Sequence, residues 1–493
     1  MSLPRVPSAR VGVPAAAVLE VLDGWQERGL ELHSLMVLRR GAVAVEGWWS
    51  PYDAATPHLL YSLSKTFTSC AVGLAVAEGL CRLDERVVDL LPAHVPPEGV
   101  DPRVAALTLH DVLSMSTGHR EDTLDTAWGT DPDDLARGFL RIPPDEPVGT
   151  LHTYHNTCTY LAGLVVQERC GTGLLEYLTP RLLEPLGIGP GHWHGDGQGH
   201  ELGFTGLHQR TEDVARLGLL LLQDGVWEGR RVLPEGWVAL MTREHVANDT
   251  DPTRGPDWRQ GYGYQVWRSR HGYRGDGAYG QFCLVVPEAD LVVATTAATE
   301  DMQGVLDVLW ERLLPALDRV DEDAEAAAQE RLADRLAALA LPVVGPVLPP
   351  GGTSYEASYV APDAGPLAPF AEGTRLTASA DGARLRLLLE LPAEQGAGAA
   401  ALSLLCPGDT WGDGPAGLLV RGGRTDAETV EVDLVLAETP HRIRLVGKGT
   451  GELAGAWNVT PLAGARLLAH VAAQVAAHDP AHVHDADGLR GPR

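Results

Sequence analysis

Apolar and polar positions divide the first 315 residues into strands at both ends and helices between them. Apolar and polar residues alternate over 33–49 on both sides of Arg39-Arg40-Gly41, which predicts an antiparallel hairpin. Residues 65–80 form a run of small and apolar side chains without proline, which predicts a buried helix. The same criteria predict helices over 109–115, 157–169, 211–223 and 302–314, and strands over 261–267, 280–287 and 291–296. This order predicts one α+β domain whose sheet is completed by N- and C-terminal segments.

The pattern changes after the acidic, alanine-rich and helical segment 321–341. Prolines and glycines concentrate in residues 342–352, which predicts a linker. Beyond it, alternation predicts two hairpins, over 375–391 and 429–446. We therefore expect four parts: a main domain over 1–341, a linker over 342–352, a β-rich accessory domain over 353–475 (a small antiparallel sheet or barrel) and a flexible tail over 476–493.

Composition excludes several classes of protein. The net charge of -27 opposes binding to nucleic acid or anionic lipid, so neither is expected as a partner. A hydrophobic content of 44% excludes general disorder, and no apolar run approaches the roughly 18 residues that span a bilayer. The six cysteines show no C-x-x-C pair and the first 28 residues lack a secretory pattern, so we expect a cytoplasmic location.

Lysine is almost absent from the chain. Only Lys65 and Lys448 occur among 39 basic residues, and the remainder are arginines. Arginine stays protonated at working pH, whereas a desolvated lysine can lose its proton. A retained lysine therefore points to a position where a neutral amine is needed.

Lys65 belongs to the sequence Ser62-Leu63-Ser64-Lys65. If Ser62 opens the predicted helix, Lys65 lies one turn further along the same face. A neighbouring base makes a serine hydroxyl nucleophilic, and desolvation beside a helix N-terminus favours the neutral amine. The backbone N–H of Ser62 would also face a developing oxyanion. A helix-capping serine followed by a snorkelling lysine is the alternative interpretation.

Two further segments carry candidate chemistry. Tyr154-His155-Asn156 begins the next predicted helix. The Tyr154 phenol, if it lies beside a lysine ammonium, can ionise and move a proton. The Asn156 amide can orient a carbonyl group. The alternative is a turn tyrosine with a capping asparagine. Gly275-Asp276-Gly277-Ala278 leads into an apolar strand, where glycines permit close approach and Ala278 can present an N–H. The alternative there is a plain β-turn.

The order and spacing of these segments resemble the serine β-lactamase and penicillin-binding superfamily, in particular its class C-like branch of esterases, amidases and D-peptidases. Ser62-x-x-Lys65 matches the first motif, and Tyr154-x-Asn156 matches the second. The segments 113–119 and 184–187 resemble the branch's "L-L-S-H-T-S-G" and "P-L-G-M" sequences. The resemblance covers about residues 15–315. It implies an antiparallel sheet flanked by helices plus an all-helical region, followed here by the β-rich domain, barrel- or lipocalin-like.

The resemblance also implies roles for individual residues. Ser62 would be the acylated nucleophile, Lys65 and Tyr154 would share proton transfer, and Asn156 would position the substrate amide or carbonyl. The N–H groups of Ser62 and Ala278 would form the oxyanion hole. The partner implied is a small ester or amide, and no metal or organic cofactor is implied.

The third motif departs from the family pattern. Gly275, Asp276 and Gly277 stand where relatives carry Lys-Thr-Gly or His-x-Gly to bind substrate, and Arg274 precedes them. Relatives that act on penicillins use that cation to hold a carboxylate. We therefore expect a poor β-lactamase that hydrolyses neutral or cationic esters or small amides.

Three alternatives stay open from the sequence. The first is acyl transfer of the D-aminopeptidase or peptide-cyclising thioesterase type, and the second is a penicillin-binding or sensor protein that does not turn over. The third is a Ser–His pair using His119 or His155. Because His155 alternates with Tyr154 and Asn156, it is expected to point away from them, and His119 is expected to be structural or to line the rim of the site.

Overall fold

The computed structural model describes residues 3–189, 191–249, 251–342, 356–362, 365–381, 384–394 and 397–478. The chain separates into two compact units, residues 1–47 with 59–339 and residues 48–58 with 340–493. The domain boundaries expected from the sequence stay predictions. Residues 343–352 of the expected linker and 479–493 of the expected tail lie outside the described residues.

In its described part, the first unit contains fourteen α-helices and eleven strands, apart from the last residue of β2 and the first residue of β3, which belong to the second unit. The helices are α1 (Ala15–Glu27), α2 (Ser64–Ala77), α3 (Val87–Leu90), α4 (Pro102–Ala105), α5 (Leu109–Leu113), α6 (Leu124–Thr130), α7 (Leu135–Leu140), α8 (Asn156–Cys170), α9 (Leu174–Leu178), α10 (Glu184–Leu186), α11 (Thr211–Leu222), α12 (Trp237–Thr242), α13 (Met302–Val308) and α14 (Glu322–Ala337). The strands are β1 (Leu32–Arg39), β2 (Ala42–Trp48), β3 (His58–Leu59), β4 (His192–Trp193), β5 (Leu207–Gln209), β6 (Val226–Trp227), β7 (Arg230–Arg231), β8 (Trp267–Arg268), β9 (Tyr273–Gly277), β10 (Gln281–Val286) and β11 (Leu291–Ala297).

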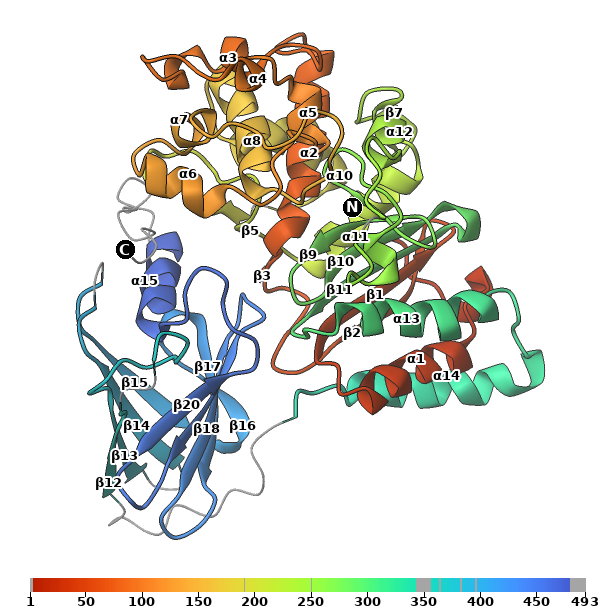
Figure 1. Cartoon of the computed structure of the whole chain (residues 1–493). Coiled ribbons are helices and arrows are strands. Elements are labelled where there is room, and N and C mark those ends of the chain that lie inside the picture. The colour runs from red at the N-terminus through yellow and green to blue at the C-terminus, as the bar shows by residue number, and fades with distance from the viewer. Residues whose placement is uncertain are drawn as a thin grey trace. The chain divides into compact units, whose positions relative to one another are not determined.

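A six-stranded sheet with the order β2-β1-β11-β10-β9-β8 forms the core of this unit (Figure 1). Strands β10 and β11 are buried along their whole length, which explains why they are continuous apolar runs rather than alternating ones. Helix α11 packs against β10 and β11, and a Cβ added at Gly218 would lie 2.6 Å from Val292 Cγ1. Helix α1 packs against both α13 and α14. The predicted α+β organisation is confirmed.

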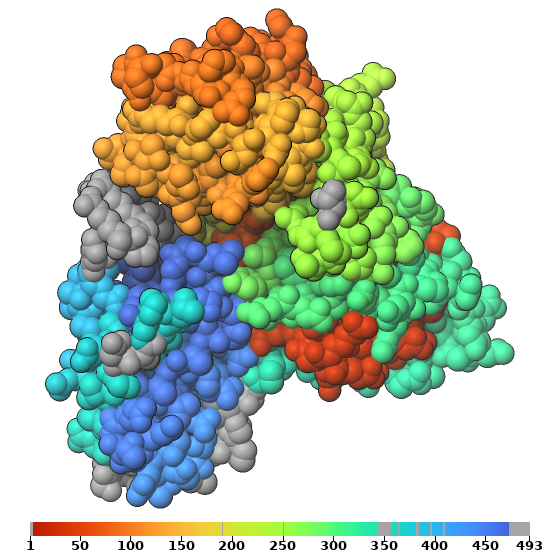
Figure 2. Space-filling model, in the orientation of Figure 1, coloured from red at the N-terminus to blue at the C-terminus, as the bar shows by residue number. Residues whose placement is uncertain are grey.

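Helices form a second region of the same unit. Helix α8 packs against α2, α5 and α9, and α2 is buried from its first residue to Ala75. In Figure 2 the orange and yellow surface of these helices continues into the red and green surface of the sheet region. Because α2 starts where the two regions meet and contacts β9, side chains at its N-terminus lie beside both.

Most expected elements of this unit are present, with one clear error. The hairpin at 33–49 is β1 and β2, and the helix expected over 65–80 is α2. The strand expected over 261–267 is wrong, because only β8 at its end is a strand; Gly261 and Gln265 have φ of 100° and 62°, which break an extended chain. The segment 275–277, also interpreted as a turn, lies in β9.

The second unit holds two antiparallel sheets over a shared core. The sheet β12-β13-β14-β15 consists of β12 (Glu356–Val360), β13 (Arg375–Asp381), β14 (Arg384–Leu391) and β15 (Ala400–Cys406). The other sheet consists of β16 (Gly408–Asp413), β17 (Leu418–Arg424), β18 (Val430–Leu436), β19 (Arg442–Gly447) and β20 (Leu453–Trp457), and helix α15 (Leu467–His478) follows.

Buried and more exposed residues alternate along several strands of the second unit, as expected for sheets that cover a core with one face. Every second residue of β14 is buried, and the buried leucines join one cluster with residues of β17 to β19. The prediction of a β-rich region is confirmed. Within the described residues the two sheets do not close into a barrel. Between β12 and the segment just before β20 there is a single isolated bridge, from Val360 to Glu452.

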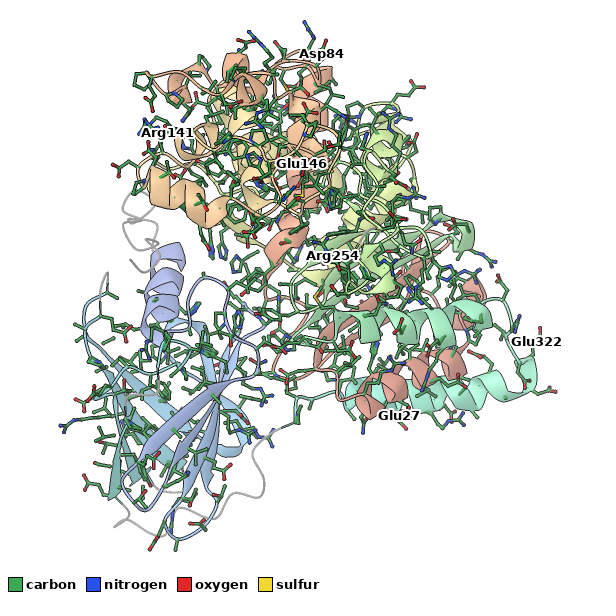
Figure 3. The ribbon with its side chains drawn as sticks, viewed as in Figure 1. Glu27, Asp84, Arg141, Glu146, Arg254 and Glu322 are labelled. Carbon is green, nitrogen blue, oxygen red and sulfur yellow. The ribbon has the colours of Figure 1, made fainter. Side chains whose placement is uncertain are left out.

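Charged side chains lie on the outside of the first unit. Glu27 at the end of α1, Glu322 at the start of α14 and Asp84 point away from the ribbon in Figure 3. This exposure agrees with the high negative charge of the chain. None of the helices within the described residues has the length and apolarity needed to cross a bilayer.

Candidate active site

Ser62 lies in a short 3₁₀ turn, Tyr61–Leu63, directly before α2. Tyr61 has φ of 48°, a left-handed conformation that is rare for a tyrosine and sharpens the turn between β3 and the helix. Ser62 is partly exposed, whereas Lys65 in the first turn of α2 is 1% exposed. The predicted proximity is present, with Lys65 Nζ 3.1 Å from Ser62 Oγ.

The Lys65 amine has three oxygen neighbours. Besides Ser62, Nζ lies 2.7 Å from Asn156 Oδ1 and 3.0 Å from the Phe204 carbonyl oxygen. Burial lowers the pKa of Lys65 to about 7, against the opposing charges of Asp122 and Asp276. A neutral amine has two hydrogens and one lone pair. Since the Asn156 and Phe204 oxygens can only accept, the lone pair is left for the Ser62 hydroxyl.

Asp122 fixes the orientation of Asn156. The Asn156 backbone N–H and side-chain Nδ2 donate to Asp122 at 3.1 and 2.6 Å, so Oδ1 must face Lys65. Surrounding protein raises the pKa of the Asp122 carboxyl above its usual range. Sequence reasoning missed Asp122, because its segment, four residues beyond Gly118, carries no motif.

Tyr154 contacts both members of the Ser62–Lys65 pair. Its hydroxyl is hydrogen-bonded to the Ser62 side chain, and Lys65 Nζ lies 4.8 Å from the centre of its ring. The ring stacks on Trp267 with centroids 5.4 Å apart. Burial raises the pKa of Tyr154 above its ordinary value, the opposite of the ionised phenol considered from the sequence. The phenol is therefore a neutral group that can donate and accept a proton in turn.

Strand β9 passes close to the Ser62 turn. A Cβ at Gly277 would collide with the Leu60 carbonyl oxygen, and a Cβ at Gly275 would lie 2.8 Å from Thr66 Oγ1. The two glycines thus let β9 approach the start of α2. Ala278 follows in the turn to β10, where its carbonyl accepts a hydrogen bond of 2.9 Å from Gln281 Nε2.

Asp276 pairs with the arginine that precedes the glycines. Arg274 is 0% exposed, and its Nε donates to Asp276 at 2.8 Å. The guanidinium also lies 4.4 Å from the centre of the Trp258 ring, and Trp258 hydrogen-bonds to Asp276. Burial raises the pKa of Asp276 despite this pairing. The cation at this position is thus enclosed by protein.

His119 and His155 lie apart from the reactive groups. The His155 ring is fully buried, accepts from the Thr123 backbone N–H at 3.2 Å and stacks on His119 with centroids 5.4 Å apart. His119 Nε2 donates to the Ile142 carbonyl at 3.0 Å. Burial lowers the pKa of both histidines. Both are packed among structural partners, as the alternation of residues 154–156 predicts for His155.

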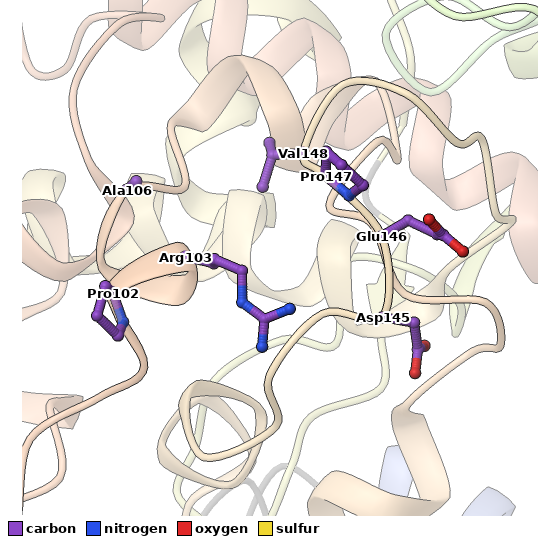
Figure 4. Close-up of a pocket in the computed structure, with 7 residues that line it drawn as sticks. All are labelled: Pro102, Arg103, Ala106, Asp145, Glu146, Pro147 and Val148. Carbon is purple, nitrogen blue, oxygen red and sulfur yellow. The ribbon is translucent and has the colours of Figure 1, made fainter.

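A separate pocket of about 440 Å³ lies in the helical region (Figure 4). Arg103 lines it together with Asp145, Glu146 and Pro147. The Arg103 side chain is already bound to Asp101 and to the Pro144 carbonyl. This pocket holds none of the motif residues and does not contribute to the chemistry around Ser62.

The fold and the cluster around Ser62 define a β-lactamase-type protein, and comparison with known proteins agrees. The chain belongs to the family described as "Beta-lactamase", whose profile matches residues 21–317. Penicillin-binding protein 4 of Amycolatopsis lactamdurans is 30% identical over 321 residues, 57% of this chain and 80% of that protein. The 6-aminohexanoate-dimer hydrolase of Paenarthrobacter ureafaciens is 24% identical over 290 residues, 54% and 73% of the two chains.

A solved structure supports the fold. The structure titled "EstCE1, a hydrolase with promiscuous acyltransferase activity" superposes with a TM-score of 0.50 at 18% identity, and covers 60% of this chain and 98% of its own. At that identity the likeness concerns the fold alone. The relatives therefore place this chain among hydrolases and penicillin-binding proteins of β-lactamase fold.

Proposed function

We propose that this protein is a serine hydrolase that forms an acyl-enzyme at Ser62 and hydrolyses esters or small amides. The observation that carries the proposal is the 3.1 Å approach of the Lys65 amine to Ser62 Oγ, at a position where burial lowers the pKa of the amine to about 7. Such an amine is partly neutral at physiological pH and can take the serine proton.

The reaction would proceed in two halves. Ser62 Oγ attacks the substrate carbonyl carbon while its proton moves to Lys65 Nζ, and the N–H groups of Ser62 and Ala278 would bind the resulting oxyanion. As the tetrahedral adduct collapses, the leaving group takes the Tyr154 hydroxyl proton and Lys65 returns a proton to Tyr154. Water then attacks the acyl carbon and gives a proton to Lys65 or Tyr154; the same group returns a proton to Ser62 Oγ as the acyl–oxygen bond breaks.

Asn156 would also bind the substrate, because its known contacts leave one side-chain hydrogen unused. Its Oδ1 faces Lys65, and one Nδ2 hydrogen is used by Asp122. The amide carries a second Nδ2 hydrogen, which would donate to a substrate carbonyl. Asn156 would therefore hold both the base and the substrate, in keeping with the role inferred from the resemblance.

The third-motif segment favours neutral or cationic substrates over penicillins. Binding a substrate carboxylate needs an accessible cation, and Arg274 is buried and paired with Asp276. Asp276 would also repel a carboxylate when ionised. We propose in addition that Gly275 and Gly277 lie beside the bound substrate; a Cβ at these positions would meet Thr66 Oγ1 and the Leu60 carbonyl oxygen respectively.

A second candidate is a penicillin-binding protein that is acylated but does not turn over. It is favoured by the name of the relative that is 30% identical, Penicillin-binding protein 4. The two candidates share the Ser62 adduct and differ in its lifetime. Acyl transfer to an amine also starts from this adduct and differs only in the acceptor.

Mass spectrometry of the intact protein separates these functions. The protein would be mixed in turn with a short nitrophenyl ester, a small amide, a penicillin and a chromogenic cephalosporin, with Ser62→Ala as control. We expect a transient adduct on Ser62 and turnover of the ester well above that of the cephalosporin. A persistent penicillin adduct would favour the second candidate, and a product carrying an added amine would favour transfer. Labelling of another residue by an active-serine phosphonate would overturn the proposal.

We also propose a cytoplasmic location, on the chemistry of the cysteines. All six are free thiols, and those at 70, 158 and 283 are fully buried. Unpaired cysteines are typical of a reducing compartment. Cell fractionation with a tagged full-length protein tests this, and recovery of the protein outside the cell would contradict it.

A further inference from the structure

Three histidines gather on a small hairpin that the proposed reaction does not use. His192 begins β4 and is paired with His208 of β5, and His194 lies two residues further on. The rings of His192 and His208 stack with centroids 3.9 Å apart, and those of His194 and His208 are 4.9 Å apart. His208 is 3% exposed, whereas His192 and His194 are partly exposed, so one side of the cluster is open to solvent.

The spacing of the three imidazoles suits one metal ion. Within the described residues, one ligand nitrogen from each histidine lies within 4.8 Å of the others. Nitrogens bound to one tetrahedral zinc at 2.0–2.1 Å are about 3.3 Å apart. The ligand nitrogens would need to move together by at most about 1.5 Å, which rotation about the side-chain bonds of the two partly exposed residues would supply.

Gly206 sets the tautomer of His208. His208 Nδ1 lies 3.1 Å from the Gly206 carbonyl oxygen, which can only accept, so Nδ1 carries the hydrogen and Nε2 carries the lone pair. Histidines that bind metals commonly donate their other ring N–H to a carbonyl in this way. The same carbonyl accepts the His194 backbone N–H at 3.1 Å. Gly206 has φ of 89°, and a Cβ there would lie 2.6 Å from His194 Cβ.

We propose that His192, His194 and His208 bind a divalent transition metal of the zinc class, with water at the remaining position. Imidazole nitrogens favour such a borderline ion over calcium or magnesium, which take oxygen ligands. The site is next to the Ser62 turn through Leu207, whose carbonyl accepts from the Leu60 N–H at 2.8 Å and whose N–H donates to Ser64 Oγ at 3.1 Å. The ion would thus brace the hairpin on which that turn rests.

Zinc binding to the full-length protein tests the proposal. After treatment with a chelator, equilibrium dialysis against Zn²⁺ should give about one tightly bound ion per chain, and Co²⁺ should give the visible bands of a tetrahedral site. Zinc should also raise the melting temperature of the protein. Binding should weaken below about pH 6, where the imidazoles take up protons.

Variants locate the ion. His192→Gln and His208→Gln should each lower zinc affinity by at least about 100-fold, and the partly exposed His192 position guards against loss of folding as the cause. The control replaces the C-terminal histidines His478, His482 and His484 by Gln and should leave binding unchanged. Absence of tight zinc binding, or its loss in the C-terminal control but not in His192→Gln, would overturn the proposal.

Discussion

At Lys65, burial and the charges of two carboxylates act on one amine in opposite directions. Enclosure lowers the pKa to about 7, while Asp122 and Asp276 prevent it from falling further. The result is an amine that changes charge near physiological pH, the condition in which a base works best. Arginine cannot reach this state, which gives a physical reason for a lysine in a chain that otherwise uses arginine.

Replacing the two central residues tests this reasoning. Ser62→Ala should abolish acylation, and Lys65→Arg should lower kcat/KM by at least about 10²–10⁴-fold although it keeps a positive charge. Steady-state hydrolysis of a nitrophenyl ester measures both. The matched control is Lys448→Arg at the exposed second lysine, which should retain full activity. Wild-type rates in Lys65→Arg would remove the neutral-amine argument.

The pH profile follows from the same amine. Because the neutral form of Lys65 is the reactive one, kcat/KM should rise with pH through about 7 and then level off. Tyr154 should not limit the alkaline side near pH 10, since burial raises its pKa above the ordinary value. Initial rates from about pH 5 to about pH 10.5 measure the profile. An activity that falls as pH rises through 7 would contradict the proposed base.

Asp122 is a positioning residue whose effect can be separated from general damage. Its charge raises the pKa of Lys65, so Asp122→Asn should move the acidic limb of the profile to lower pH by about one unit. It should also lower kcat, because Asn156 is less firmly oriented. The control is Asp125→Asn, because Asp125 is an exposed neighbour and its replacement should leave the acidic limb of the pH profile where it is. A lower rate with an unshifted limb would mean that Asp122 acts only through the fold.

At the scale of elements, the site depends on how closely β9 approaches the start of α2. The helices were predictable because α2 and α8 contain long runs of small and apolar residues, and because α8 ends at Gly171, which has a left-handed conformation. Strand β9 was harder to predict, since the sequence around Gly275 and Gly277 is also typical of a turn, and both glycines are held extended by pairing with Cys283 and Gln281 of β10. The three-histidine cluster was missed for a similar reason: His192 and His208 are sixteen residues apart and meet only through strand pairing.

A pair of glycine substitutions tests this close approach. Gly277→Ala places a Cβ against the Leu60 carbonyl, a backbone atom that cannot yield easily, so it should cost about 1–3 kcal/mol of unfolding free energy and displace the Ser62 turn. Urea unfolding and ester turnover measure the two effects. Gly129→Ala in α6, where a Cβ meets nothing within 4 Å, should be neutral or slightly stabilising. Equal behaviour of the two variants would show that β9 is not tightly packed on the turn.

For the whole molecule, the family accounts for one part of the chain. The family match ends at residue 317, before the strands β12 to β20 begin. The two β-sheets have a hydrophobic core of their own, which includes Leu387, Leu434 and Leu445. The residues proposed to carry the chemistry at Ser62 all belong to the first unit, whereas the net charge of -27 belongs to the complete chain.

That charge leads to a prediction about substrates. A net charge of -27 attracts cations and repels anions over distances set by the screening length, which shrinks from about 30 Å at 0.01 M salt to less than 10 Å at 0.5 M. Raising the salt concentration across this range should lower kcat/KM for a cationic ester by at least about twofold, leave a neutral ester unchanged and raise the value for an anionic ester. Three nitrophenyl esters of equal size and different charge provide the measurement. If all three respond alike, the field of the whole chain does not select substrates, and only the contacts around Asp276 do.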